Sequence, residues 1–309
     1  MKGKGRGERS PGERSFSLLG AGRMGTGLAL ALVKAGWRPL RIWSRKRSSI
    51  ARARKVLGGG RGTLDPVRAS REAPLVVLGV PDDALSPMVD EVARGGGVKE
   101  GSFWIHLSGF HGLEPLRAAA RARARVLGIH PLQTVPDPRE GPARLAGAYF
   151  SLVGAPGDLP FGKALVEEVG GRPVVMPPGR RPLYHAAAVL ACNDFVALFS
   201  LASRVLERAT GGELDGRALL VLVRAALEGL ERLGPAGALT GPVARGDLGV
   251  VEGHLEALGR EAPWALEAYR CLGLEALRLA RLGGGNDALN AIERKLRAGP
   301  AFPRGGKKG

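Results

Sequence analysis

The pattern of hydrophobic and polar residues changes once along the chain. Up to about residue 178, short apolar runs alternate with amphipathic stretches; the runs cover residues 16–19, 40–44, 74–80, 102–107, 126–129, 148–153 and 173–176. From residue 183 onward the apolar spacing is helical, with no convincing strand. Short apolar runs are typical of strands and a 3.6-residue spacing of helices, so the sequence predicts an α/β half followed by an all-helical half.

This pattern sets the predicted domains. We expect a Rossmann-like, doubly wound sheet over residues 15–178 and a helical domain over 179–299. Basic, polar tails at 1–14 and 300–309 are expected to be disordered. The apolar run Ala186–Ala202 is interrupted by Asn193 and Asp194. It therefore predicts a buried helix rather than a membrane span.

A glycine pattern follows the first predicted strand. The residues are Gly20, Ala21, Gly22, Arg23, Met24 and Gly25. Gly20 permits a tight turn, Gly22 lets a pyrophosphate approach the backbone, and Gly25 lets the next helix pack against the strand. The position between strand and helix favours a dinucleotide-binding loop, with a glycine-rich turn that binds nothing as the alternative.

The end of the second predicted strand indicates which dinucleotide. Ser44, Arg45 and Lys46 stand where an NAD-binding protein carries an acid for the ribose hydroxyls, and the next acid after this segment is Asp65. Residues 38–61 hold nine basic side chains. Guanidinium and hydroxyl groups suit a 2'-phosphate, so we predict NADP, with Arg45 as the main contact. The alternative is an exposed, basic start to the next helix.

Further candidates lie where later strands end. Val80 and Pro81 are expected beside the cofactor, and the acids that follow them are expected to cap a helix beginning near Ala84. Ser108 and His130 follow other strands and are candidates for substrate binding. His130 is equally consistent with a turn histidine bonded to its own backbone.

The helical half offers the remaining candidates. His185 and Asn193 are eight residues apart, so in a regular helix their directions differ by about 80°. Thr240 and Arg245 could hold a carboxylate, with Asp247 beside them. The alternative is an interhelical loop in which Asp247 caps the next helix.

Composition narrows the function classes. Two cysteines form neither a disulfide framework nor a metal-binding spacing, which is consistent with the cytoplasm, and no secretory signal is evident. Six of the seventeen net positive charges lie in the tails, and aromatic residues are only 5% of the chain. We therefore expect no membrane partner and no nucleic-acid partner.

Six motifs together resemble one family: GAGRMG at 20–25, VPDD at 80–83, HLSG at 106–109, HP at 130–131, YHAAAVLACN at 184–193 and LTGPVARGD at 239–247. The chain resembles two-domain oxidoreductases with a Rossmann-like domain and a helical domain of formerly unknown function. That family is similar in plan to ketopantoate reductases, pyrroline-5-carboxylate reductases and the 6-phosphogluconate dehydrogenase superfamily. Related reductases often present a catalytic lysine in the helix where this chain offers His185.

The resemblance implies an NADPH-dependent reductase of a small, ketopantoate-like 2-oxo acid. His185 would donate a proton, Asn193 would orient the substrate oxygen, and Thr240 and Arg245 would bind its carboxylate in a cleft between the domains. A homodimer through the helical domain is expected as well. The alternatives are an imine reductase and a non-catalytic, NADP-binding regulatory or scaffold protein.

Overall fold

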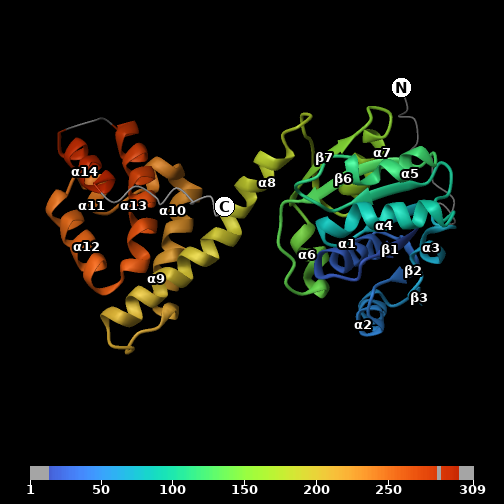
Figure 1. The fold of residues 1–309 in the computed structure, drawn as a ribbon, viewed down its shortest axis with the longest axis horizontal. Helices are drawn as coiled ribbons and strands as arrows, with labels where there is room; N and C mark the ends of the chain where they lie inside the picture. The colour runs from blue at the N-terminus through green and yellow to red at the C-terminus, as the bar shows by residue number, and fades with distance from the viewer. Residues whose placement is uncertain (1–13, 284–286, 299–309) are drawn as a thin grey trace, which may run out of the picture. The chain divides into compact units, whose positions relative to one another are not determined.

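The computed structural model describes residues 14–283 and 287–298. The chain forms two compact units that divide between Leu190 and Ala191, and each is described by itself (Figure 1). The division falls within a helix, whereas the sequence pattern placed the boundary near residue 178. The predicted tails at 1–14 and 300–309 lie outside the described residues, except Arg14, which forms an ion pair with Glu168 at 3.0 Å.

The first unit is built on one eight-stranded sheet of order β3-β2-β1-β4-β5-β6-β7-β8. The strands are β1 (Ser15–Leu19), β2 (Arg38–Trp43), β3 (Arg61–Thr63), β4 (Leu75–Leu78), β5 (Phe103–His106), β6 (Arg125–Pro131), β7 (Tyr149–Gly154) and β8 (Arg172–Val175). Neighbouring strands are parallel except β6 and β7. The carboxyl ends of β1, β2, β4, β5 and β6 therefore share one edge of the sheet.

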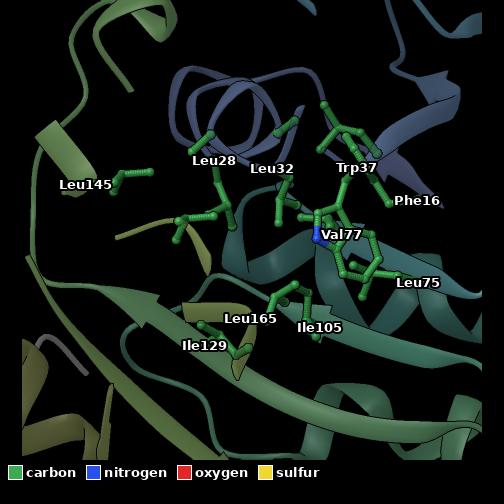
Figure 2. Close-up of a cluster of buried hydrophobic side chains, with 14 of the residues drawn as sticks. Phe16, Leu28, Leu32, Trp37, Leu75, Val77, Ile105, Ile129, Leu145 and Leu165 are labelled. Atoms are coloured by element: carbon green, nitrogen blue, oxygen red, sulfur yellow. The ribbon is translucent and has the colours of Figure 1, made fainter. Parts of the chain in front are cut away.

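Helices cover both faces of this sheet (Figure 1). The helical segments of this unit are α1 (Arg23–Lys34), α2 (Arg47–Leu57), α3 (Pro66–Ser70), α4 (Asp82–Arg94), η1 (Glu114–Leu116), α5 (Arg117–Arg121), η2 (Pro138–Glu140), α6 (Gly141–Leu145), α7 (Leu159–Glu168) and α8 (Arg181–Val189), of which α8 belongs to neither core. One core packs α1, α6 and α7 against the sheet, and Leu28, Leu145 and Leu165 belong to it (Figure 2). The other core packs α3, α4 and α5 against the opposite face. The predicted doubly wound, Rossmann-like fold is confirmed.

Several local predictions were wrong. The Pro-rich stretch after β6, for which the sequence pattern predicted no regular element, contains η2 and α6. Helix α6 packs against α1 through two glycines: a Cβ on Gly141 would lie 2.5 Å from the Cα of Gly27. Neither β3 nor α3 was expected. Strand β6 runs through His130, which pairs with Ser151 of β7, so His130 is not a turn residue.

The second unit is all-helical over its described residues, as predicted. It comprises most of η3, a π-helical segment (Leu190–Asp194), followed by α9 (Phe195–Ala209), η4 (Gly216–Leu219), α10 (Leu220–Ala238), α11 (Pro242–Arg245), α12 (Leu248–Glu261), α13 (Pro263–Ala280), η5 (Arg281–Gly283) and α14 (Asp287–Arg297). Its core gathers apolar side chains of α11 to α14, namely Val243, Val251, Leu277, Leu289, Ile292 and Leu296.

The predicted buried helix is instead exposed. Helix α8, η3 and α9 form one continuous helix, Arg181–Ala209, with a hydropathy of 1.7, and none of its most apolar window is buried. By length and composition alone this helix could cross a membrane, although a core helix of a soluble protein passes the same test. Val196 is 62% exposed, and α9 and α10 have no buried residue among them. Within the second unit, these two helices therefore present apolar side chains that the rest of that unit does not cover.

Candidate functional site

The turn after β1 and the end of β4 approach each other through glycines. Gly20 has a φ of +105°, and a Cβ there would lie 2.5 Å from the carbonyl carbon of Gly79. A Cβ on Gly25 would lie 2.8 Å from the Gly20 oxygen, so α1 packs tightly against the turn. Gly22 precedes α1, whose first turn contains no acidic residue. The backbone N–H groups of this turn are thus free of a competing carboxylate from the helix.

A cavity of about 1160 Å³ opens at this edge of the sheet. Nine residues proposed from the sequence as cofactor ligands line it: Gly20, Ala21, Gly22, Arg23, Ser44, Arg45, Lys46, Val80 and Pro81. Two others do not. Met24 packs against the hydrophobic core, and Gly25 supports the turn from behind.

The cavity is strongly basic. Its cationic lining residues are Arg23, Arg45, Lys46, Arg52, Lys55 and Arg139, against the acids Glu91 and Asp137. Asp137 is already paired with Arg139 at 2.5 Å, and Arg52 donates to the Ser49 hydroxyl at 3.2 Å. A glycine-lined turn with surplus guanidinium and ammonium groups fits the phosphates of a dinucleotide.

A second group of polar side chains joins the ends of β4 and β5. The Ser108 hydroxyl donates to the Asp82 carboxylate at 2.9 Å and accepts from the N–H groups of Phe110 and His111 at 3.1 and 3.0 Å. Asp82 therefore holds the loop after β5 and makes no side-chain capping bond, although it lies in the first turn of α4. The hydroxyl's donor and both acceptor positions are used within the protein, which leaves none for the substrate contact expected of Ser108.

His106 is fully buried beneath this loop. Its Nδ1 accepts from the Ser108 N–H at 3.2 Å, and its Nε2 donates to the Gly112 carbonyl at 2.6 Å. Burial lowers the pKa of His106 to about 4, so the ring is neutral at pH 7 and its two nitrogens have opposite roles.

His130 lies on the neighbouring strand and meets α8. Its Nδ1 is 3.0 Å from the Tyr184 hydroxyl, and its ring lies edge-on to His185 with centroids 5.9 Å apart. Burial, and then the charge of Arg181, lower the pKa of His130 to about 4, while burial raises the pKa of Tyr184. A neutral phenol donating to Nδ1 leaves the imidazole proton on Nε2, facing Gly109 and His185.

Arg181 anchors α8 to this cluster. Only 3% of the residue is exposed, and its guanidinium donates to the carbonyl oxygens of Ser108 and Gly109. Burial lowers its pKa to about 10, so it carries a full charge at pH 7. This buried cation fixes the loop after β5 relative to Tyr184 and His185.

In the second unit, the candidates lie on a loop and on η3. The Arg245 Nε contacts the Asp247 carboxylate at 2.7 Å, and Asp247 precedes α12 without a side-chain capping bond. Thr240 and Asn193 are both exposed. Because Asn193 lies in a π-helical segment, the 80° separation expected for a regular α-helix does not apply to it.

Two family models match the chain, one on each side of the connection between β6 and β7. Residues 4–131 match the model described as a Rossmann-like domain, and residues 148–276 match the one described as "Domain of unknown function (DUF2520)". The match to the Rossmann-like model is thus followed along the chain by the match to the DUF2520 model. This combination agrees with the family resemblance drawn from the motifs. The sequence of the chain matches no curated protein.

Solved structures share this fold along their whole length. A candidate NADP oxidoreductase from Bacteroides fragilis is 24% identical with a TM-score of 0.73, over 86% of this chain and 99% of that one. An imine reductase from Streptomyces aurantiacus is 19% identical (TM-score 0.61, 92% and 99% covered). A reductive aminase from Aspergillus terreus, solved with NADPH and ethyl-5-oxohexanoate, is also 19% identical (0.64, 91% and 99%). These similarities establish the fold.

Sequence reasoning missed several residues of the site. Arg181 and Tyr184 sit on α8 beside His185, and the Pro136–Arg139 segment lines the cavity. Tyr184 was visible as part of a motif, but nothing in the sequence linked it to His130. The approach of residues 136–139 to the cavity depends on the contact of Gly27 with Gly141.

Proposed function

We propose that this protein is an NADPH-dependent reductase that acts on a C=O or C=N group, with a small 2-oxo acid as the leading substrate class. One observation supports it most: a basic cavity lies at the carboxyl ends of β1, β2 and β4, and a cluster of histidines lies at the same edge of the sheet, where β5 and β6 end. In open α/β sheets ligands bind outside the carboxyl ends of the strands.

The cavity would hold NADPH by its two phosphate regions. The Gly20–Gly22 turn would receive the pyrophosphate, and Arg45, with Ser44 and Lys46, would receive the 2'-phosphate. Arg52 and Lys55 extend this basic wall along α2. When bound, NADPH supplies a hydride.

Replacing Arg45 tests the cofactor assignment. Arg45→Gln should weaken NADPH binding by tenfold or more while changing NADH binding less than twofold, because only NADPH carries the 2'-phosphate. Fluorescence titration of both cofactors measures this. Arg47→Gln removes the same charge from a residue that does not line the cavity and serves as the control. A parent protein that prefers NADH would contradict the proposal.

For the reaction, we assign His185 as the proton donor. His130 is neutral at pH 7, so the Tyr184–His130 pair would position the imidazole of His185 rather than donate a proton itself. Asn193 would orient the substrate oxygen, and Thr240 and Arg245, beside Asp247, would bind a carboxylate.

Replacing His185 tests this role. His185→Gln should lower kcat by about a hundredfold with little change in NADPH affinity, in the range that a lost general acid costs. Tyr184→Phe should lower kcat less and shift the pH profile, because it removes only the bond to His130. Equal turnover by parent and His185→Gln would exclude the proton-donor role.

Activity assays with a panel of compounds test the proposed substrate class. The parent should oxidise NADPH with 2-oxo acids, and Arg245→Gln should raise KM for these acids while leaving KM for neutral carbonyl compounds unchanged. The imine reductase and the reductive aminase among the similar structures favour an imine as the second candidate. NADPH binding without oxidation by any oxo acid, imine or ketone–amine pair would instead support a regulatory or scaffold protein.

We further propose that the protein is a cytoplasmic homodimer. Helix α10 carries Arg224, Glu228, Glu231 and Arg232 opposite its exposed apolar side chains, which suits a protein interface better than a lipid bilayer. A second copy covering α9 and α10 satisfies the apolar faces of both chains at once. Both cysteines are free, as in proteins of a reducing compartment.

A further inference from the structure

A second cavity, of about 460 Å³, lies in the first unit and shares no residue with the cofactor cavity. Its walls come from the start of β2, the turn between α2 and β3, and α3 with the turn that follows it. The lining residues used below are Ser17, Arg38, Arg41, Arg54, Arg61 and Glu72. The cofactor cavity is lined at the carboxyl ends of the strands, whereas this one is lined where β2 and β3 begin.

The basic run of residues 38–61 is divided between the two cavities. Four of its nine basic residues line the cofactor cavity: Arg45, Lys46, Arg52 and Lys55. Four others line the second cavity: Arg38, Arg41, Arg54 and Arg61. Arg47 lines neither. A 2'-phosphate therefore explains only part of the positive charge in this segment.

The charge of the second cavity is poorly balanced. Its acid, Glu72, is 3.4 Å from the Arg41 guanidinium, and Arg54 donates to the Gly60 carbonyl at 3.0 Å. Within the described part of the chain, no salt bridge engages Arg38, Arg54 or Arg61. Arginine keeps its charge at any physiological pH, so four guanidinium groups against one carboxylate give the cavity a positive potential that favours an anion.

A buried hydroxyl without a partner belongs to a residue that lines this cavity. Ser17, in the middle of β1, is completely buried, and its Oγ has no hydrogen-bond partner among the described residues. Ser17 also lines the cavity. A hydroxyl without a partner is unfavourable in a protein interior, and a ligand oxygen in the cavity would give it one.

We propose that this cavity is a second anion site that binds a small phosphate-bearing metabolite. The guanidinium groups of Arg38, Arg54 and Arg61 would pair with phosphate oxygens, for which their planar fork is well suited, and Ser17 would donate a hydrogen bond. A cavity of this volume accommodates a small molecule. The site would be separate from the cofactor and would not depend on the reductase activity.

Isothermal titration of the full chain with inorganic pyrophosphate, in the presence of saturating NADPH, tests the proposal. The double variant R38Q/R61Q should bind pyrophosphate at least tenfold more weakly than the parent. R47Q removes a charge from the same segment outside both cavities and should bind within twofold of the parent. Unchanged binding by R38Q/R61Q, or equal weakening by R47Q, would overturn the site.

Ser17→Ala gives an independent measurement. It should weaken pyrophosphate binding several-fold while leaving the melting temperature unchanged or higher, because the unpartnered hydroxyl is removed. Unchanged pyrophosphate affinity in a folded Ser17→Ala variant would remove Ser17 from the site and count against the proposal. Since the readout is binding, its failure leaves the reductase proposal standing, and an inactive protein can still show this site.

Discussion

Two neutral histidines at the ends of β5 and β6 make stability depend on pH. Burial lowers the pKa of His106 and of His130 to about 4, below the ordinary value of 6.5. The unfolded chain therefore binds more protons between pH 6.5 and 4, so the free energy of unfolding should fall as pH falls through that window. For His106 the full loss is about 3 kcal/mol. Urea unfolding at a series of pH values measures the slope.

Matched variants distinguish the contribution of these two histidines to the pH dependence of stability from that of other titrating groups. The double variant H106N/H130N keeps an acceptor near each Nδ1 but cannot titrate, so it should lose most of the slope between pH 6.5 and 4. His254→Asn replaces an exposed histidine of α12 and should keep the parent slope. A parent whose stability is flat over this window would contradict the burial argument.

At the residue scale, the sequence predicted the roles of residues that depend on their neighbours along the chain. It did not predict contacts between residues that are far apart in the sequence. Gly20 and Gly25 could be assigned because a strand, a turn and a helix follow one another within a few residues. The contact of Asp82 with Ser108 spans 26 residues, and that of His130 with Tyr184 spans 54. Neither leaves a periodic trace in the sequence, because each depends on how β4, β5, β6 and α8 are placed in space.

The two-glycine contact between α1 and α6 controls one wall of the cofactor cavity. A Cβ at Gly141 would lie 2.5 Å from the Cα and the oxygen of Gly27, so Gly141→Ala must push α6 outward. We expect a loss of about 1–3 kcal/mol in the free energy of unfolding. NADPH should also bind more weakly, because residues 136–139 line the cavity. Urea unfolding and cofactor titration on the same sample test both effects.

A second glycine provides the control. A Cβ on Gly157 would meet no atom within 4 Å, so Gly157→Ala should be close to neutral in both measurements. If Gly141→Ala also behaves like the parent, α6 is free to move, and the helix pair does not shape the cavity.

At the element scale, the prediction succeeded where elements are long and regular. Continuous apolar runs identified β1, β4 and β5, which are buried on both faces of the sheet. The short elements were not predicted, because β3 has three residues and α3 and α6 have five each, which is too few to show a period. These elements form because tertiary packing, such as Gly27 against Gly141, supplies what local preference does not.

At the scale of the whole molecule, composition predicted two halves but not the state of their apolar surface. The helical spacing after residue 183 correctly predicted an all-helical second unit over its described residues. The same apolar spacing suggested burial of Ala186–Ala202, yet Leu190 is 66% and Val196 62% exposed. Hydrophobicity indicates that a helix needs a covering surface, but it does not say whether that surface belongs to the same chain.

The proposed homodimer would cover that surface with a second copy, and a charged substitution on α9 tests this proposal. Sedimentation of the parent should give a mass near twice the 32.3 kDa of one chain. Val196→Glu should shift the protein toward monomer, because each interface would then bury two carboxylates without partners. Val250→Glu changes an exposed valine of α12 and should remain dimeric. A monomeric parent would exclude the dimer, and a parent recovered only with detergent would instead make the Arg181–Ala209 helix a membrane segment.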